Sequence, residues 1–153
     1  PEVHLAFALP KGGRLSTLLD MVAQLGVASV RPLNCERSIS RWKENKGERS
    51  QRLLIEACKQ SRQAYLPALL PESSPLEALQ WARERGLRVL LAHPGGGALE
   101  AGSGVILLGP EGGFSAAEVS GLVERGAETV SLGTGILRIE TAAVAASAAL
   151  RFC

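Results

Sequence analysis

Residues 104–118 read GVILLGPEGGFSAAE, and this stretch decides the expected fold. The apolar run at its start is typical of a strand that has both faces of its sheet covered. A glycine-rich turn follows, and Ser115 with Glu118 three residues later is the pattern of a capped helix start. A buried strand, a turn and a capped helix in this order predict an α/β fold.

The same unit recurs on both sides of this stretch. Three expected helices end in Gly26, Gly86 and Gly126, and an apolar or β-branched run follows each glycine at once. Glycine suits the left-handed conformation that ends many helices, because it has no Cβ to cause a steric clash. Ser74 and Glu77 form a second capping pattern. This alternation predicts a mostly parallel sheet with helices on both faces.

The expected strands cover residues 3–9, 27–31, 64–66, 88–92, 104–109 and 129–132. The expected helices cover residues 17–25, 49–62, 75–85, 116–125 and 139–152. Residues 36–52 are the most polar stretch, which we interpret as a mobile loop leading into a helix. Because the chain has 153 residues, 46% of them hydrophobic, we expect one domain over residues 1–153.

Composition excludes several classes of function. Seventeen Lys and Arg against fifteen Asp and Glu give a net charge of only +2, so any affinity for nucleic acid must come from local clustering. Residues 36–52 hold such a cluster around Trp42, although a solvated surface would have the same composition. Cys35, Cys58 and Cys153 lack the spacing of a zinc or redox site. We therefore expect no metal, no membrane segment, and free thiols in a reducing, cytoplasmic compartment.

Two more glycine-rich turns follow expected strands. Residues 131–141 read SLGTGILRIET, and residues 91–97 read LAHPGGG. In open α/β sheets, ligands bind outside the carboxyl ends of the strands, so three such turns on neighbouring strands would line one pocket. Each turn also has a plain structural interpretation, as a tight or flexible connection, and His93 alone is more often structural than catalytic. The first turn lacks the lysine of a Walker loop and the spacing of a dinucleotide-binding fingerprint.

The sequence GPEGGFSAAE at residues 109–118, followed by SLGTGILRIETA at residues 131–142, resembles a known paired signature. It is similar to the C-terminal motifs of the RsmE-type 16S ribosomal RNA uracil-N3 methyltransferases, a branch of the SPOUT superfamily. Residues 9–38 (LPKGGRLSTLLDMVAQLGVASVRPLNCERS) and 52–69 (RLLIEACKQSRQAYLPAL) resemble further segments of this family in the same order. The resemblance therefore covers essentially the whole chain.

This resemblance implies an α/β SPOUT domain with a deep C-terminal trefoil knot. It also implies that the domain binds S-adenosyl-L-methionine, methylates N3 of a uridine in 16S ribosomal RNA of the small subunit, and forms a homodimer through the knot region. Family members carry a small N-terminal PUA-like β-barrel that helps to hold RNA, and we expect this chain to lack it. Such a knot is too rare for topology rules to suggest.

Carried over by motif, the expected cofactor-binding residues all lie on the three turns or the strand ends before them. They are Leu91, His93, Leu108, Gly109, Glu111, Gly112, Gly113, Leu132, Gly133, Ile136, Leu137 and Arg138. The expected RNA-binding residues are cations on loops that would contact phosphate: Lys11, Arg14, Arg37 and Arg41.

The expected catalytic residues follow from the chemistry that the resemblance implies. Uracil N3 becomes a nucleophile only when its N–H is lost, and a guanidinium beside the flanking carbonyl oxygens would stabilise the anion. Arg138 is the first candidate and Arg62 the second, while Glu140 is a candidate proton acceptor. The structural alternative for Arg138 is an ion pair with Glu140 or Glu111 that holds the knot.

Two positions depart from the family pattern. Gly135 stands where the family usually has Arg, and Met21 stands where it often has Lys. If those side chains hold RNA in the family, we expect this chain to bind RNA differently or more weakly. Two alternatives to uracil-N3 methylation therefore stay open: another SPOUT methyltransferase acting on a tRNA ribose or base, and a cofactor- or RNA-binding module with little turnover.

Overall fold

The structure is a computed structural model that describes the backbone of residues 1–153 and every side chain except those of residues 44 and 45. Its helices are α1 (Arg14–Gln24), α2 (Glu44–Ser61), α3 (Pro75–Glu84), α4 (Ala116–Glu124) and α5 (Ile139–Phe152). Its strands are β1 (Val3–Ala8), β2 (Ser29–Leu33), β3 (Ala68–Leu69), β4 (Val89–Gly97), β5 (Gly104–Leu108) and β6 (Glu128–Val130). They form one sheet in the order β3-β2-β1-β5-β4-β6.

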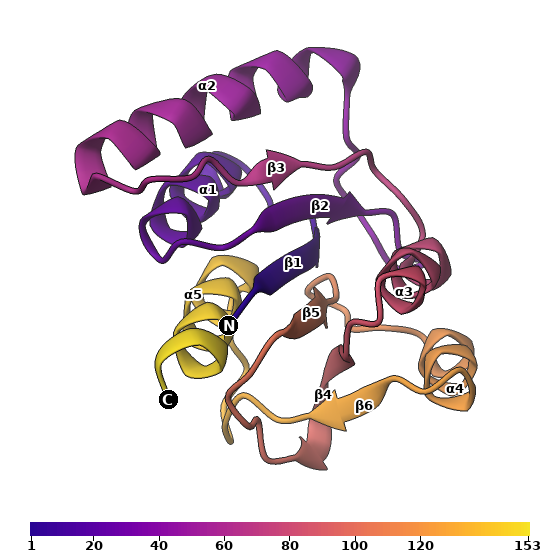
Figure 1. The fold of residues 1–153 in the computed structure, drawn as a ribbon. Coiled ribbons are helices and arrows are strands. Elements are labelled where there is room, and N and C mark those ends of the chain that lie inside the picture. Colours follow the sequence, from indigo (N-terminus) through magenta and orange to yellow (C-terminus); the bar gives the residue numbers. More distant parts are fainter.

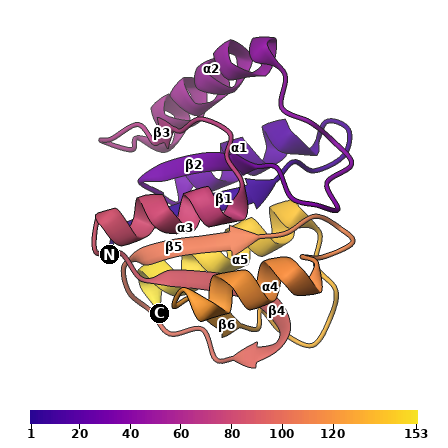
Figure 2. The same cartoon turned by 90° about the vertical axis from the view of Figure 1, so that its right-hand side faces the viewer.

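The sheet is parallel and has helices on both faces, which confirms the predicted fold class. Figures 1 and 2 show α1, α2 and α5 on one face and α3 and α4 on the other. The central strands β1 and β5 are buried along their whole lengths, as their apolar sequences predict. The core is therefore a layer of apolar side chains on each face of β1 and β5.

The helix ends follow the predicted chemistry. Gly26, Gly86 and Gly126 have φ angles of 71°, 66° and 98°, in the left-handed region where a residue with a side chain is strained. Both capping boxes are present, at Ser74 before α3 and Ser115 before α4. These local signals fix where the helices begin and end.

The strand expected at residues 64–66 was wrong. Tyr65 and Leu66 are exposed, and the pairing occurs farther along, where Ala68 N–H donates to the Ala28 carbonyl oxygen at 3.0 Å and Leu70 N–H donates to the Val30 oxygen at 2.9 Å. The chain must first run from the end of α2 to the edge of β2. The position of the strand is therefore determined by its pairing with β2 and not by the local sequence. Helix α2 also begins at Glu44 and takes in residues that were expected to form a loop.

The three glycines after the apolar part of β4 have a structural reason. Strand β4 continues to Gly97, which pairs with Val130 of β6. A Cβ placed on Gly96 would lie 2.6 Å from the Val130 backbone nitrogen, a distance that real side chains do not reach. The two backbones therefore touch here, because one of them carries no side chain.

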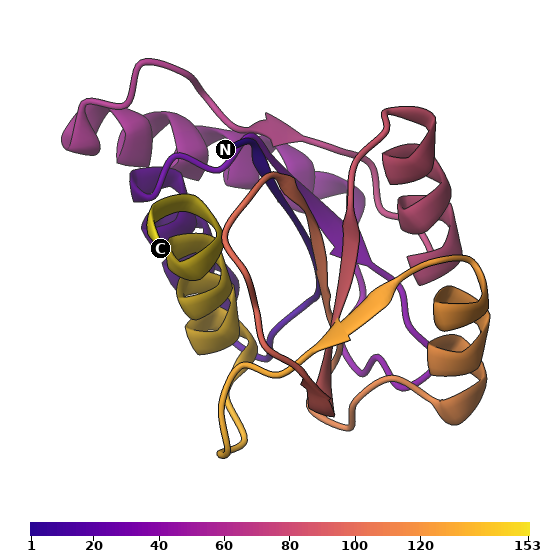
Figure 3. The ribbon, with the colours of Figure 1, turned by 60° about the horizontal axis from the view of Figure 1, so that its bottom comes forward.

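The connection from β4 to β5 is unusual for neighbouring parallel strands, because residues 98–103 contain no helix. Gly102 N–H donates to the Leu150 carbonyl oxygen at 2.9 Å, so this connection lies against the last turn of α5, which itself packs on β1 and β5 (Figure 3). The last helix thus packs on the central strands and also contacts an earlier connection, which is compatible with threading. The deep knot itself stays a prediction. Within the described residues, no helix combines the length and the apolar character needed to cross a bilayer.

Candidate functional site

A cavity of about 560 Å³ lies at the carboxyl ends of β4, β5 and β6. Cavities of this size are typical of small-molecule sites. Three strand-to-turn segments form most of its wall, and the first turn of α5 adds Ile139 and Ala142. The structure thus brings together the three glycine-rich turns that were predicted to meet at one edge of the sheet.

The turn after β5 has several contacts within its own segment. Gly113 N–H donates to the Pro110 carbonyl oxygen at 2.8 Å, and Gly113 has a φ of 78° that favours glycine. A Cβ on Gly109 would lie 3.0 Å from the ring of Phe114, which is buried. Ser115 then caps α4 by accepting a hydrogen bond from Glu118 N–H. Packing, turn geometry and cap therefore all restrain this wall of the cavity.

The turn after β6 is anchored at its start. Ser131 N–H donates to the Gly97 carbonyl oxygen at 2.8 Å, which ties this turn to the end of β4. The Ser131 hydroxyl donates to the Gly133 oxygen at 3.0 Å, and Gly133 has a φ of 124°. Beyond this anchor the turn projects outward, and the Ile136 side chain is fully exposed at the rim.

The glycines of these turns leave backbone open to the cavity. An added Cβ would meet no atom within 4 Å at Gly95, Gly113, Gly133 or Gly135. A ligand can therefore approach the N–H and C=O groups of each turn directly. The lining is mostly apolar and includes the acidic residue Glu111, so the site suits a ligand with a flat ring, hydrogen-bonding edges and a positive charge.

Most of the residues predicted to bind a cofactor line this cavity: His93, Leu108, Gly109, Glu111, Gly113, Leu132, Gly133, Ile136 and Leu137. Three others do not. Leu91 is fully buried within β4, one residue before the lining residue Ala92. Gly112 directs its carbonyl oxygen out of the cavity, where it accepts a hydrogen bond from Arg37. Arg138 lies beyond the lining, at the entry of α5.

Several lining residues were missed from the sequence: Ala92, Pro94, Gly95, Pro110, Phe114, Ser131, Thr134, Gly135, Ile139 and Ala142. Some of these had a readable signal, because they sit inside the quoted motifs. Ile139 and Ala142 are spaced by one helical turn, so they share a face of α5. The sequence gives no signal that this face of α5 contacts the glycine-rich turns in addition to the core.

The two predicted catalytic arginines lie far apart in the fold. Arg138 is the N-cap residue of α5 and is exposed, and among the described side chains it forms no ion pair with Glu140 or Glu111. The structural alternative for Arg138 therefore finds no support in these contacts. Arg62 follows α2 and precedes β3, so it lies at the amino edge of the sheet, away from the cavity.

Glu140 is buried, with 8% of its surface exposed, on the face of α5 that also carries Ala143 and Ser147. Its Oε2 has no hydrogen-bond partner among the described residues. A buried acceptor without a donor costs about 1–3 kcal/mol. Glu140 lies between the lining residues Ile139 and Ala142 in the sequence, but it is not itself part of the cavity wall.

The predicted RNA-binding residues gather at the carboxyl edge of the sheet, as the cavity does. Lys11 lies between β1 and α1, and Arg14 is the first residue of α1, whereas Arg37 and Arg41 lie in the segment between β2 and α2. Lys11 and Arg41 are exposed, and Arg14 is half-buried. Arg37 differs from the others because its guanidinium already has a protein partner, the Gly112 carbonyl oxygen at 2.9 Å.

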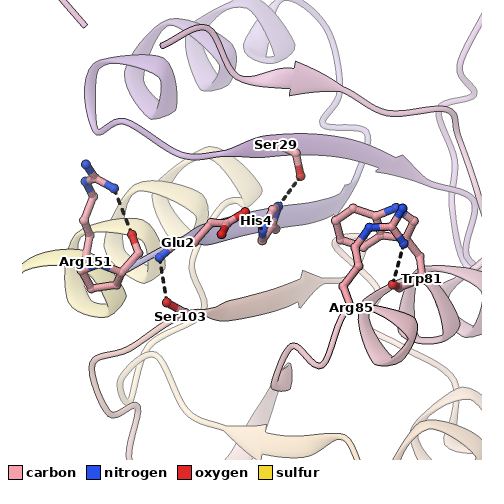
Figure 4. Close-up of polar contacts among 8 residues, drawn as sticks. Glu2, His4, Ser29, Trp81, Arg85, Ser103 and Arg151 are labelled. Atoms are coloured by element: carbon pink, nitrogen blue, oxygen red, sulfur yellow. Dashed lines mark hydrogen bonds and ion pairs between the residues drawn. The ribbon is translucent and has the colours of Figure 1, made fainter. Parts of the chain in front are cut away.

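A second polar cluster lies away from the cavity (Figure 4). His4 Nδ1 lies 2.7 Å from Ser29 Oγ, and His4 Nε2 lies 3.1 Å from Glu2 Oε1, in the order of a nucleophile, a base and an acid. Ser29, however, is only 3% exposed, so no substrate reaches its hydroxyl. Burial lowers the pKa of His4 more than Glu2 raises it. This cluster ties β1 to β2 and has a structural role.

Comparison with known proteins adds independent findings. The chain matches the family model described as RNA methyltransferase domain over residues 1–151. It is 36% identical to ribosomal RNA small subunit methyltransferase E of Synechocystis sp., over 95% of this chain and 52% of that protein. It is 31% identical to the protein of the same name from Mycobacterium tuberculosis, over 98% of this chain and 63% of that one.

A solved structure agrees with these matches. The chain superposes on ribosomal RNA small subunit methyltransferase E of Neisseria gonorrhoeae bound to S-adenosyl methionine, with a TM-score of 0.84 and 31% identity. The match covers 97% of this chain and 65% of that structure. The chain thus spans between 52% and 63% of the length of the two curated relatives named above.

Proposed function

The chain belongs to the family of RNA methyltransferase domains, and we propose that it transfers a methyl group from S-adenosyl-L-methionine to N3 of a uridine in 16S ribosomal RNA of the small subunit. The observation that carries this proposal is the single cavity built from three glycine-rich turns. The names of the relatives support a small-subunit RNA substrate. The ligand of the Neisseria structure supports the methyl donor.

The residues of the cavity fit this cofactor. The open backbone beside Gly95, Gly113 and Gly133 offers donors and acceptors to an adenine edge and to ribose hydroxyls. Leu108 and Leu132 supply apolar contact for a ring. When bound, the cofactor supplies an electrophilic methyl group on a positively charged sulfur. The Glu111 carboxylate would stabilise that charge from the cavity wall.

Arg138 is the proposed catalytic residue. Its exposed guanidinium stands at the entry of α5, next to the lining residue Leu137. From there it would stabilise the negative charge that develops on the uracil carbonyl oxygens when N3 loses its proton. Glu140 is the proposed proton acceptor, through water, because one oxygen of its buried carboxylate has no hydrogen-bond partner among the described residues and it lies on the first turn of α5, which also lines the cavity. Arg62 of the same chain has no part in this scheme.

We propose that the cationic side chains at the carboxyl edge of the sheet bind the RNA substrate. Lys11, Arg14 and Arg41 would contact phosphate groups and set the orientation of the RNA without reading its sequence. Such contacts make affinity fall with salt. Holding the base and the methyl group in line supplies much of the rate, because it replaces a bimolecular encounter.

We further propose that residues 1–153 act as one SPOUT domain that pairs with a second copy through the knot region. One continuous core from Val3 to Leu150 supports the single domain. The fully exposed Ile136 and the partly exposed Leu137 support the pairing, because both are apolar and both lie at the cavity rim. The free thiols of the chain support a reducing, cytoplasmic location. Light scattering after size-exclusion chromatography would give the mass of the assembly.

Nucleoside analysis by mass spectrometry tests the reaction. Unmethylated 16S ribosomal RNA is incubated with the protein and S-adenosyl-L-methionine, digested and analysed for 3-methyluridine. The proposal expects this nucleoside in stoichiometric amounts. A methyl group on ribose would instead assign the protein to another SPOUT reaction. Calorimetric binding of the cofactor without any product, on naked RNA and on small subunits alike, would mark it as a binding module.

A further inference from the structure

The segment after β2 touches the cofactor-binding region from outside. Residues 35–38 form a turn of their own: Ser38 N–H donates to the Cys35 carbonyl oxygen at 3.1 Å, and Cys35 N–H donates to Ser38 Oγ at 3.0 Å. These two bonds place Glu36 and Arg37 at the exposed corner. We call residues 35–38 the docking turn.

The docking turn makes two contacts with the segment that follows β5. Arg37 Nη1 donates to the Gly112 carbonyl oxygen at 2.9 Å, and Glu36 N–H donates to Glu118 Oε2 at 3.1 Å. The other oxygen of the Glu118 carboxylate accepts a hydrogen bond from Ser115 N–H at 2.9 Å, which completes the cap of α4. One contact thus holds the tip of the glycine-rich turn, and the other holds the start of the next helix.

The glycine-rich turn at residues 110–113 has two sides. Pro110, Glu111 and Gly113 line the cavity, whereas the Gly112 carbonyl oxygen accepts its hydrogen bond from Arg37 on the outside. The contact therefore restrains this turn without taking up space in the cavity. Arg37 was expected to bind phosphate, and in the structure its guanidinium also contacts the turn that forms one wall of the cavity.

We propose that Arg37 is a positioning residue that couples cofactor binding to RNA binding. It holds the 110–113 turn in its binding conformation, and the same segment of chain presents Arg41 and Lys43 at the carboxyl edge of the sheet. RNA that orders this segment tightens cofactor binding, and the cofactor tightens RNA binding by the same factor, because coupling between two sites is reciprocal. This inference rests on the proposed function.

The first test measures S-adenosyl-L-methionine affinity by calorimetry without RNA. Arg37→Ala should weaken binding about fivefold, a typical loss for one hydrogen bond from a charged donor near the surface. Arg37→Lys should keep most of the affinity, because an ammonium group can donate to the same carbonyl oxygen. Arg49→Ala is the matched control: it removes the same charge from an exposed position on α2, and its side chain makes no hydrogen bond or ion pair in the described part of the chain. Its cofactor affinity should equal that of the wild type.

The second test measures the coupling itself. The ratio of cofactor affinities with and without a 16S ribosomal RNA transcript should exceed one in the wild type and approach one in Arg37→Ala. Unchanged cofactor affinity in Arg37→Ala without RNA, with only a raised RNA KM and a smaller salt dependence, would show a phosphate contact and overturn the inference. Melting curves check that Arg37→Ala folds, and if it does not, Arg37→Met, which keeps the aliphatic part of the side chain but has no hydrogen-bond donor, takes its place and should show the same loss.

The two tests separate this inference from the proposed function. A wild type that binds the cofactor but makes no 3-methyluridine sinks the proposed reaction, while the calorimetric comparison still supports or overturns the role of Arg37. A wild type that binds no cofactor overturns both. If Arg37→Ala methylates normally and its cofactor affinity is unchanged, the role of Arg37 is overturned and the proposed reaction is not affected.

Discussion

Arg138 is the residue that most directly tests the proposed chemistry. Arg138→Ala should lower kcat by about 100-fold or more, as expected for the loss of one group that stabilises a developing oxyanion. The side chain is exposed and makes no hydrogen bond among the described residues, so the melting temperature should hardly change. Steady-state kinetics and a melting curve of the same preparation check both statements. Full activity would remove Arg138 from the mechanism.

Gly135 is one of the two residues where this chain departs from the family that it resembles. A Cβ there meets no atom within 4 Å, and its φ is not in the left-handed region, so a side chain is accommodated without strain. Gly135→Arg should tighten RNA binding and raise the salt dependence by about one counterion. Filter binding at several salt concentrations measures this slope.

Gly133→Arg is a control for that substitution. It adds the same charge two residues away, where space is equally open but φ is 124°. Strain should then lower the melting temperature, which Gly135→Arg should not do. If the two variants gained RNA affinity and lost stability equally, the distinction between these glycines would be wrong.

At the scale of elements, the two capping boxes form a matched pair. Ser115→Ala and Ser74→Ala should each lower the free energy of unfolding by about 1 kcal/mol, because each removes the acceptor of a helix N-terminal N–H. Ser115 follows the glycine-rich wall of the cavity directly, whereas Ser74 caps α3, which does not reach the cavity. Only Ser115→Ala should therefore also weaken cofactor binding.

Urea titration and calorimetry of the two variants give both quantities. Equal cofactor affinity in Ser115→Ala and Ser74→Ala would mean that the start of α4 does not support the cavity wall. A much smaller stability loss in one variant would mean that water replaces the lost acceptor there.

The elements show what the sequence can and cannot tell. Helix α5 was predicted at its observed bounds, because its entry and its apolar face are both local signals. Strand β3 was misplaced, because its position is set by pairing with β2, and nothing in residues 64–66 encodes that register. The cavity turns were predictable as glycine-rich strand ends, whereas the turning of Gly112 towards Arg37 depends on a contact between residues 75 positions apart.

At the scale of the whole molecule, His4 makes stability depend on pH. Burial lowers its pKa from 6.5 in the folded state, while the unfolded chain keeps the ordinary value. The unfolded state therefore binds more protons just below pH 6.5, and the free energy of unfolding falls as pH decreases from about 6.5. The slope is at most about 1.4 kcal/mol per pH unit. Hydrogen bonds to Ser74 lower the pKa of Glu77 from 4.5, so this residue changes the free energy of unfolding only in more acidic solution.

Chemical denaturation at pH 7.5, 6.5 and 5.5 measures this dependence. His4→Gln is the control, because it keeps a polar side chain beside Ser29 but cannot take up a proton in this range. The variant should be less stable at neutral pH and should show a flatter profile between pH 6.5 and 5.5. An identical slope in both proteins would assign the effect to other groups.

The close backbone contact between β4 and β6 at Gly96 has a consequence for anyone who surveys variants of this chain. At Gly96 the two backbones leave room for a hydrogen atom and nothing larger, and the turn that begins at Ser131 is tied to the neighbouring Gly97. Even alanine would push β6 outward and carry one wall of the proposed methyl-donor site with it. A saturation screen scored on activity would therefore rank Gly96, which is absent from the cavity lining, among the positions least tolerant of change.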